Sequence, residues 1–415
     1  MSNIKAIKNE IKFKNIVNIE KSIKIYINYK DIELYDLSVV YELILYLRWS
    51  SNFDRIKRNY YIKYLAIGFM ERSNYIDFRY SDVFTIYFDF IHKEDRESTE
   101  TIKDALDFCV PKEYLKYHYF LYKGLLKYHN NEEDHREYLS IAGKLFTSYA
   151  REKKYGNHNL RGLQYIMSDD DVRCYAKKSL KNMEINFNLN SEKGDKFIHI
   201  IALDSKYYDR FSKYFFIKNS RNSIIKHIHI INPTLKQIDD LNNNSINYSY
   251  EYEKFLDKKP YYISSRFLIM NNIMDKYKNT EYFLITDADS ILVEAETLEI
   301  LNEFANSNTH SLAMQCNKSF YPWSKHGAGM IIVKNDDISS RFFDSFNKCF
   351  FSLFDTSRNE TMNTQWWIDQ GIIYSLVEYY NINVFNISNA EKYIFFPKGD
   401  KDIELNIFLE SKGIK

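Results

Sequence analysis

Two carboxylates, Asp287 and Asp289, are separated by one residue and directly follow the apolar run 282–286. Carboxylates at positions i and i+2, on a turn that leaves a buried strand, converge well on a hydrated divalent cation. Their hard oxygens suit Mg²⁺ or Mn²⁺, which keep several waters and take further ligands from substrate phosphates. Such a cation neutralises the charge that develops on a departing diphosphate. We therefore predict a metal site at this turn, with Asp287 and Asp289 as ligands.

A second acidic triplet, Asp169–Asp171, has the same residue types in a different context. It follows a helical pattern instead of a strand, so we interpret it as a solvated turn or a helix start. The turn at 287–289 is bounded by apolar runs at 282–286 and 291–293. The context of the two acidic segments, more than the spacing of their carboxylates, separates them.

The elements around the acidic turn alternate between strand and helix patterns. Short, apolar, β-branched runs at 196–203, 224–231 and 282–286 are typical of strands buried on both faces. Amphipathic stretches at about 207–217 and 261–277 indicate helices between them. This alternation predicts an α/β domain with a mostly parallel sheet. Ligands bind beyond the carboxyl ends of strands in such sheets, which is where the acidic turn lies.

The first part of the chain has the apolar periodicity of helices instead. From about Leu37 to Met183, apolar residues recur at i, i+3 and i+4, with breaks at segments such as 129–131. The pattern is compatible with a short array of tetratricopeptide type, but it has no clean 34-residue period, which leaves an irregular helical domain as the alternative. We interpret the polar stretch at 186–195 as a linker. We expect a helical domain over 1–190 and an α/β domain over 196–415.

Bulk properties exclude several classes of protein. The 57 Lys+Arg and 56 Asp+Glu residues leave a net charge of +1, so no global field attracts nucleic acid. The four cysteines form no CxxC pair, which fits a reducing compartment. Residues 1–30 lack the apolar stretch of a secretory signal, and no apolar window is long enough for a transmembrane helix. We expect a cytoplasmic protein without nucleic-acid or transmembrane function.

Four ordered motifs resemble the GT-A-fold glycosyltransferases, a Rossmann-like α/β class with a mixed sheet. They are Arg266-Phe-Leu268, Thr286-Asp-Ala-Asp289, the segment 326–333 and Trp367-Ile-Asp-Gln370. The nearest pattern is that of glycogenin and the lipopolysaccharide galactosyltransferases, which are retaining enzymes. The resemblance covers residues 196–415, and the helical domain that precedes them is an addition to the family's fold.

The resemblance implies which residues contact a nucleotide sugar. They are Ala202, Asp204, Tyr207, Arg266, Asp287, Ala288, Gly327, Ala328, Gly329, Lys398, Gly399 and Lys401. A carboxylate at Asp204 suits ribose or base donors and Tyr207 suits stacking, although an ordinary strand end is an equal alternative. The planar fork of Arg266 suits a bridge between phosphate and the Asp pair, the alternative being a plain surface arginine. Small residues at 327–329 let backbone approach the sugar.

The resemblance also implies the catalytic residues Arg266, Asp369 and Gln370. In a retaining enzyme, Asp369 or Gln370 would stabilise an oxocarbenium-like centre, and in an inverting enzyme Asp369 would be the base. Gly371 replaces the Asp that follows in the family, so the stereochemistry stays open.

Two further departures from the family bear on ligand binding. Gly327 stands where the family has a sugar-contacting Asn, and the C-terminal His that supplies a third metal ligand is missing near Lys398. Asp400 is an outside candidate for that ligand. His326 lies too far along the chain and is interpreted as structural.

The leading hypothesis is a metal-dependent glycosyltransferase that uses Mn²⁺ or Mg²⁺ and moves a hexose from a nucleotide sugar, with UDP expected. Its acceptor could be a glycan, a lipid-linked glycan or a protein, with the helical domain holding the acceptor or a partner protein. One alternative is a sugar nucleotidyltransferase, although the segment 202–205 lacks the glycine-rich phosphate loop of such enzymes. Another alternative is an interaction scaffold with an inactive transferase fold.

Overall fold

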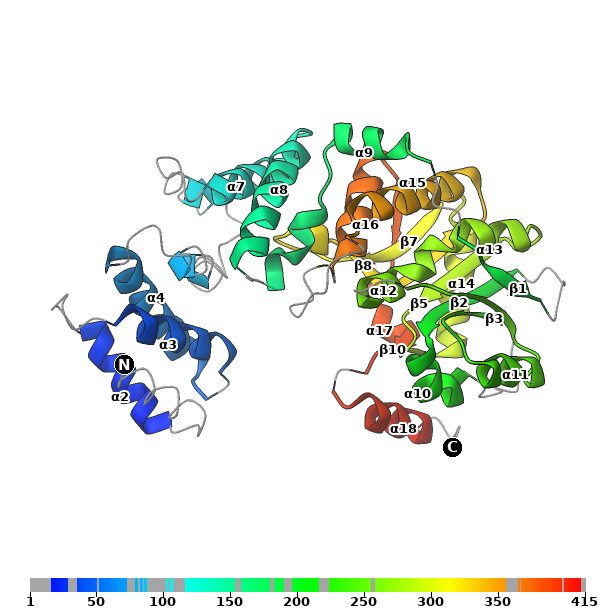
Figure 1. The fold of residues 1–415 in the computed structure, drawn as a ribbon, viewed down its shortest axis with the longest axis horizontal. Helices are drawn as coiled ribbons and strands as arrows, with labels where there is room; N and C mark the ends of the chain where they lie inside the picture. The colour runs from blue at the N-terminus through cyan, green and yellow to red at the C-terminus, as the bar shows by residue number, and fades with distance from the viewer. Residues whose placement is uncertain are drawn as a thin grey trace. The chain divides into compact units, whose positions relative to one another are not determined.

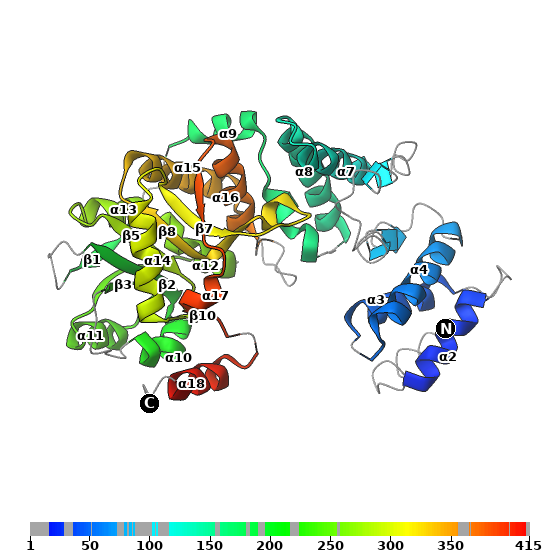
Figure 2. The ribbon, with the colours of Figure 1, turned by 180° about the vertical axis from the view of Figure 1, so that it is seen from behind.

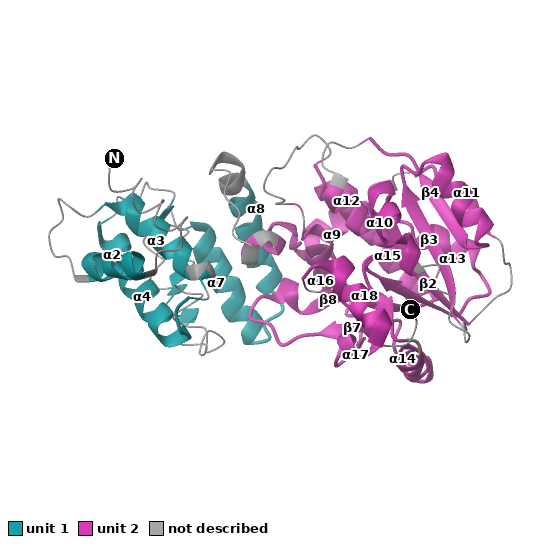
Figure 3. Ribbon diagram, turned by 90° about the horizontal axis from the view of Figure 1, so that it is seen from below, with its two compact units in different colours: residues 1–157 teal, residues 158–415 magenta. Residues whose placement is uncertain are grey.

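The structure is a computed structural model of the 415-residue chain, which divides into two compact units, residues 1–157 and 158–415 (Figure 3). It describes residues 16–28, 36–50, 52–72, 79–80, 83–84, 86–87, 102–103, 105–106, 116–153, 158–179, 183–189, 196–215, 224–254, 258–355, 365, 367–397 and 399–411. Among these residues, we find no helix with the length and apolar character that a membrane crossing requires.

The first unit is helical throughout its described elements. They are α2 (Ile16–Asn28), α3 (Leu37–Trp49), α4 (Arg55–Arg72), α7 (Lys116–His129) and α8 (His135–Lys153). α7 and α8 form a hairpin in which Gly124 allows a close approach, since a Cβ there would lie 2.7 Å from Leu139 Cδ2 and 3.1 Å from Leu139 N. Asn131 takes a left-handed conformation, with φ of 57°, in the turn between them. The break that the sequence predicted at 129–131 is confirmed.

The second unit is an α/β domain with a mixed sheet, as the sequence predicted, and the sheet has eight strands (Figure 1). Its strands are β1 (Asn186–Asn188), β2 (Phe197–Asp204), β3 (Ile225–Ile231), β4 (Asn247–Glu251), β5 (Tyr282–Thr286), β7 (Leu312–Cys316), β8 (His326–Lys334) and β9 (Val384–Asn386). The spatial order is β1-β4-β3-β2-β5-β8-β7-β9. β4, β3, β2 and β5 are parallel, whereas β8 is antiparallel to both β5 and β7. A small antiparallel ladder joins β6 (Ile291–Leu292) to β10 (Ile394–Phe395).

Helices cover both faces of this sheet, which explains its continuous apolar strands. One face packs against η2 (His158–Tyr165), α9 (Asp169–Ala176), α12 (Lys258–Leu268), α13 (Met270–Lys276), α15 (Asp337–Leu353) and α16 (Ile368–Tyr379). The other packs against α10 (Ser205–Phe215), α11 (Leu235–Asn243), α14 (Glu294–Asn306), α17 (Ala390–Tyr393) and α18 (Lys401–Ser411). α14 lies over the strands in the view from behind (Figure 2). Within β2, Ile198 and Ile200 face the first layer, while Ile201 and Leu203 face the second.

Residues 158–189 belong to the compact second unit, although the sequence pattern grouped them with the helices. The reason is packing: Tyr165, Met167 and Val172 are buried in the same core as Ile198 and Ile200. The stretch 186–195, interpreted from the sequence as a linker, begins with β1, an antiparallel edge strand.

The chain reverses direction across the sheet at β2. It runs from β2 through β3 to β4 on one side, and α12 and α13 then return it to β5 on the other side of β2. Such a topological switch point opens a crevice at the carboxyl ends of the two strands. Asp204 ends β2, and Asp287 directly follows β5.

Candidate active site

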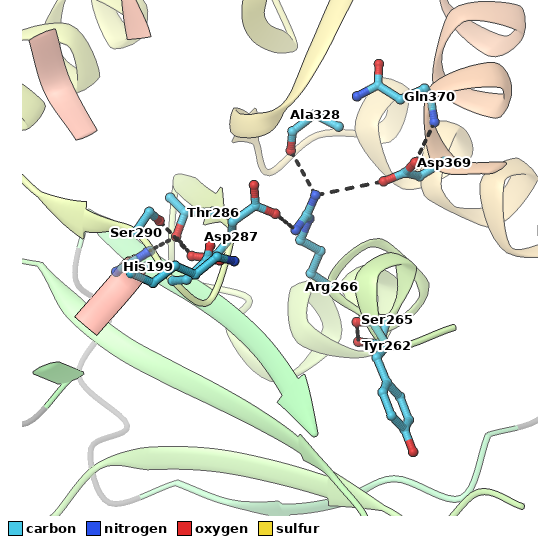
Figure 4. A network of polar contacts seen from close by, with 12 residues as sticks. His199, Tyr262, Ser265, Arg266, Thr286, Asp287, Ser290, Ala328, Asp369 and Gln370 are labelled. Atoms are coloured by element: carbon cyan, nitrogen blue, oxygen red, sulfur yellow. Dashed lines mark hydrogen bonds and ion pairs between the residues drawn. The ribbon is translucent and has the colours of Figure 1, made fainter. Parts of the chain in front are cut away.

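The turn after β5 is fixed by hydrogen bonds to its backbone (Figure 4). The Asp287 N–H donates to the Gly329 carbonyl at 3.3 Å, and the Asp287 carbonyl accepts from Ser290 Oγ at 2.6 Å and Thr286 Oγ1 at 3.2 Å. Thr286 Oγ1 in turn lies 2.7 Å from Nε2 of the buried His199 on β2. Sequence reasoning missed His199, whose signal is a polar residue within an otherwise apolar buried strand.

Arg266, near the end of α12, lies at the centre of a charged cluster (Figure 4). Its guanidinium pairs with Asp287 Oδ1, donates to the Ala328 carbonyl at 3.1 Å, and lies 3.9 Å from Asp369 Oδ2. The residue is only 4% exposed, so the interpretation as a plain surface arginine is wrong. The planar fork of Arg266 thereby joins the β5 turn, β8 and α16, which no lysine could contact in the same way.

Burial changes the acidity of the two carboxyls beside Arg266. It raises the pKa of Asp369 to about 6, against a smaller opposing effect of Arg266. It also raises the pKa of Asp287, with Arg266 opposing and Asp289 reinforcing the rise. The Asp287 side chain is 35% exposed, so water moderates this shift more than it does at Asp369.

Asp289, the second predicted metal ligand, forms an ion pair with Lys401 of α18. Burial alone would lower the pKa of Lys401, but the hydrogen bond and charge of Asp289 raise it. The Lys401 ammonium also lies 5.8 Å from the centre of the Tyr207 ring. The structure therefore brings the predicted residues Asp289, Lys401 and Tyr207 together, across 112 positions of sequence between the two charged groups.

Asp204 and Tyr207, two of the residues predicted to bind the nucleoside, take part in capping α10. Asp204 Oδ1 accepts a hydrogen bond from the Tyr207 N–H at 2.8 Å, which caps this helix. Tyr207 itself is 39% exposed, whereas Ala202 is buried. A capping carboxylate and an exposed ring are compatible with both interpretations of this segment, a nucleoside-binding edge and an ordinary strand end.

The small residues of β8 bring backbone close to the acidic turn. A Cβ at Gly329 would lie 3.2 Å from Phe396 Cε1 and 3.3 Å from Asp287 Oδ2. Gly327 is less constrained, since a Cβ there would lie 3.4 Å from the nearest atom, Gln315 Cβ. Ala328 contributes its carbonyl to Arg266. Gly329 thus lies in closer packing than Gly327, which the sequence did not reveal.

Asp369 and Gln370 lie in the first turn of α16, and Asp369 Oδ1 accepts from the Gln370 N–H at 2.8 Å. The next residue, Gly371, has no room for a side chain. A Cβ at Gly371 would lie 2.6 Å from Tyr165 Cβ and 2.9 Å from the Gly162 carbonyl oxygen. The η2 segment therefore occupies the space that a side chain at this position would need.

Of the remaining candidate residues, Lys398 lies outside the described residues, whereas Gly399, Asp400 and His326 lie within them. The Gly399 N–H donates to Glu404 Oε1 at 2.7 Å, and Asp400 Oδ1 caps α18 by accepting from the Asp402 and Ile403 N–H groups. His326 is buried at the start of β8, where burial lowers its pKa to about 4.

The second acidic triplet begins a helix, as the sequence predicted. Asp169, Asp170 and Asp171 form the first turn of α9, and Asp171 completes a capping box with Ser168. Carboxylates are favoured at this end of a helix because they complement its dipole. The triplet has a structural role.

The donor set at the turn fits a divalent cation that arrives with phosphate. Asp287 and Asp289 supply hard oxygens, and the described residues contain no group of three or more His, Cys, Asp or Glu side chains suited to a metal. Two carboxylates suffice for Mg²⁺ or Mn²⁺ when substrate phosphates and water complete the shell. Both carboxylates are already paired with basic groups, Arg266 and Lys401.

No family model matches the sequence, and no curated protein does. Among solved structures, the apo glycosyltransferase GlyE of Streptococcus pneumoniae TIGR4 matches with 12% identity and a TM-score of 0.30, over 47% of this chain and 46% of that one. Mouse xyloside xylosyltransferase 1, in apo form, matches with 7% identity and a TM-score of 0.29, over 46% and 85%. A mannosyltransferase of Pyrobaculum calidifontis, solved with GDP-Man and Mn²⁺, matches with 13% identity and a TM-score of 0.23, over 55% and 67%.

The chain thus spans less than half of the length of the first of these structures. The fold class itself rests on the strand order and the switch point, and it is the one that the sequence predicted. The chemistry of the site rests on the contacts of its own residues.

Proposed function

We propose that the chain is a glycosyltransferase that moves a sugar from a nucleoside-diphosphate sugar to a glycan, lipid or protein acceptor. The observation that carries the proposal is the charged cluster at the switch point. Arg266 of α12 links Asp287 to Asp369 of α16, and Lys401 of α18 pairs with Asp289 beside them. Five charged groups from distant parts of the chain meet at the edge of the sheet where ligands bind.

The cluster has the groups that a departing diphosphate requires. Asp287 and Asp289 would hold Mn²⁺ or Mg²⁺, which supplies Lewis-acid stabilisation of the leaving group when bound. The ammonium of Lys401 is the more exposed of the two basic groups and binds phosphate as a point charge. Tyr207 offers a half-exposed ring for the base, with UDP as our proposed carrier.

Asp369 is our candidate for the group that acts at the sugar. Its pKa of about 6 lies near neutral pH, where a carboxylate is an effective general base. In an inverting transfer, Asp369 takes the acceptor proton. In a retaining transfer, its charge or the Gln370 amide stabilises the positive anomeric centre. The anomeric configuration of the product, read by NMR, separates the two mechanisms.

We propose that the helical unit binds the acceptor. A groove on this unit of about 640 Å³ is lined by Lys24, Ile27, Asp54, Ile56, Lys57, Tyr60 and Tyr61. Tyr60 and Tyr64 present half-exposed rings whose centres are 4.6 Å apart on one face of α4. Exposed rings of this kind stack on sugars or on a partner's side chains.

Release of nucleoside diphosphate from UDP- and GDP-sugars in the presence of Mn²⁺ tests the proposed reaction. We expect turnover by the full chain and a loss of roughly 100-fold or more in Asp289→Asn, because the variant weakens the hold on the leaving diphosphate. Asp344→Asn is a matched control, since it removes a carboxylate that pairs with Lys348 on α15. Equal turnover in Asp289→Asn and the control would contradict the role of the acidic turn, and a chain that binds no nucleotide would favour the interaction scaffold.

A further inference from the structure

Lys401 places a positive charge at the N-terminal end of α18, where the helix itself does not favour one. It is the first residue of α18, and a positive charge at the N-terminal end of a helix opposes the helix dipole. The cap of this helix is already provided by Asp400, and Asp402 and Glu404 supply the favourable charge in its first turn. The position of the Lys401 ammonium is therefore set by its partner outside the helix, Asp289.

The backbone of Lys401 is anchored, so only its side chain is free to change partner. Arg210 Nη2 of α10 lies 2.7 Å from Asp402 Oδ2. Leu405 and Leu409 are buried against the sheet, and the rings of Phe395 and Phe408 stack with centres 4.3 Å apart. A lysine carries its charge on a flexible four-carbon stem, which allows the ammonium to move while α18 stays in place.

The two basic groups of the site differ in how firmly they are held. Arg266 is buried and touches Asp287, Asp369 and the Ala328 carbonyl. The Lys401 side chain is 33% exposed and, among the described residues, contacts the Asp289 carboxylate and the Tyr207 side chain. A negatively charged ligand at the switch point can therefore draw Lys401 away from Asp289 more easily than it can draw Arg266 from Asp287.

We propose that Lys401 is a built-in counter-cation that occupies Asp289 until a diphosphate draws its ammonium away, so that a divalent cation gains Asp289 only together with the nucleotide. The inference rests on the proposed function, because it requires that a nucleoside diphosphate binds at this turn. Lys401 and a divalent cation compete for the same carboxylate in the free protein. With the nucleotide bound, the phosphates satisfy Lys401 and the carboxylate is released. Nucleotide and metal then bind cooperatively, and the coupling is reciprocal.

Calorimetric titration of Mn²⁺ into the full-length protein, with and without UDP or GDP, tests this competition. We expect Lys401→Met to bind Mn²⁺ about tenfold more tightly than wild type when nucleotide is absent, because a charge-assisted pair no longer competes. We also expect the nucleotide to strengthen Mn²⁺ binding to wild type more than to the variant. Lys392→Met is the control, since it removes an exposed lysine that pairs with Glu299. Lys401→Arg keeps the positive charge and should bind Mn²⁺ as weakly as wild type.

Equal Mn²⁺ affinities of wild type and Lys401→Met without nucleotide would overturn the inference. If UDP or GDP still binds wild type in that case, the proposed function stands without it. Failure of wild type to bind either nucleotide would overturn the proposed function and the inference with it. Matching circular dichroism spectra of all four proteins establish that the variants are folded.

Discussion

The Asp369 carboxyl combines deep burial with a contact to a single guanidinium. Burial raises its pKa from an ordinary value of 3.8 to about 6, so the folded protein holds this proton more tightly than the unfolded chain does. The resulting stabilisation is complete below pH 3.8 and is lost as the pH rises through about 6. Above that pH, the folded protein carries a buried charge that disfavours folding, which is a property of functional sites more often than of structural ones.

Asp369→Asn tests this consequence at the residue scale. We expect the variant to lose turnover but to be more stable than wild type at pH 8, by about 2 kcal/mol, since the amide has no charge to bury. The gain should shrink as the pH falls from 6 to 4. Urea unfolding at pH 4, 6 and 8 measures it, with Asp344→Asn as the comparison. A variant that is less stable than wild type at pH 8 would show that the Asp369 charge stabilises the fold.

At the scale of elements, η2 and α16 pack so closely that their contact decides which residues the site can use. Gly371 faces Tyr165 and the Gly162 carbonyl, and a Cβ at Gly162 would lie 2.4 Å from Trp323 Cδ1 on the short helix η3 (Pro322–Ser324). The backbone of α16 meets the backbone of η2 at Gly371, so the two elements have little room to move apart. The first turn of α16, which carries Asp369, is thereby fixed against residues some two hundred positions earlier.

We expect Gly371→Ala to destabilise the protein by about 2 to 3 kcal/mol, because the added methyl overpacks the contact between η2 and α16. The direction of this change in stability is informative, since alanine in a helix is otherwise favoured over glycine by about 1 kcal/mol. Thermal and urea unfolding measure the change. Gly327→Ala is the control, because its Cβ would meet only ordinary contacts. Equal stability of the two variants would contradict the close packing.

At the scale of the whole molecule, the second unit has a core of its own. Among the residues that the structure describes, the three buried apolar clusters that contain its sheet include none before Tyr165. They do include Tyr165, Met167, Val172 and Met183, which precede the sheet strand β2. The core of the second unit thus includes elements that precede β2, and the compact unit itself begins at His158.

A fragment of residues 158–415 should therefore fold by itself and bind nucleotide. A fragment of 196–415 lacks at least the four side chains just named, as well as the buried Leu160, Leu163 and Ile166. It should lose most of its stability, since burial of each large apolar side chain contributes about 1.5 to 3 kcal/mol. Cooperative unfolding, followed by circular dichroism, compares the two fragments. If the shorter fragment is as stable as the longer one, the boundary belongs near 196, as the sequence pattern predicted.

Features that depend on local apolar patterns could be predicted from the sequence, whereas features that depend on contacts between distant residues could not. β5 was predicted at its observed bounds because its apolar run is short and ends at Asp287, and β2 and β3 were predicted within one residue. The stretch 261–277 was predicted as one helix, but it divides at Ile269 into α12 and α13. β1 was missed because the polar sequence Asn-Phe-Asn has no strand pattern.

Within the site, the sequence located the acidic turn because a strand precedes it. The partners of Asp287 and Asp289 lie 21 and 112 positions away, and no periodicity relates such positions. The Arg266 contact with Asp287 followed only from the resemblance, and the pairing of Lys401 with Asp289 was not predicted. The reason for Gly371 could not be predicted either, because it depends on the packing of η2.

The central claim is that a nucleoside diphosphate binds at the carboxyl ends of β2 and β5. A crystal structure of the full chain with UDP or GDP and Mn²⁺ tests it most directly. We predict diphosphate density against Asp287, Asp289 and Lys401, the base beside Tyr207, and the Lys401 ammonium moved from Asp289 to a phosphate oxygen. Nucleotide density elsewhere on the molecule, or none at saturating nucleotide, would contradict the account.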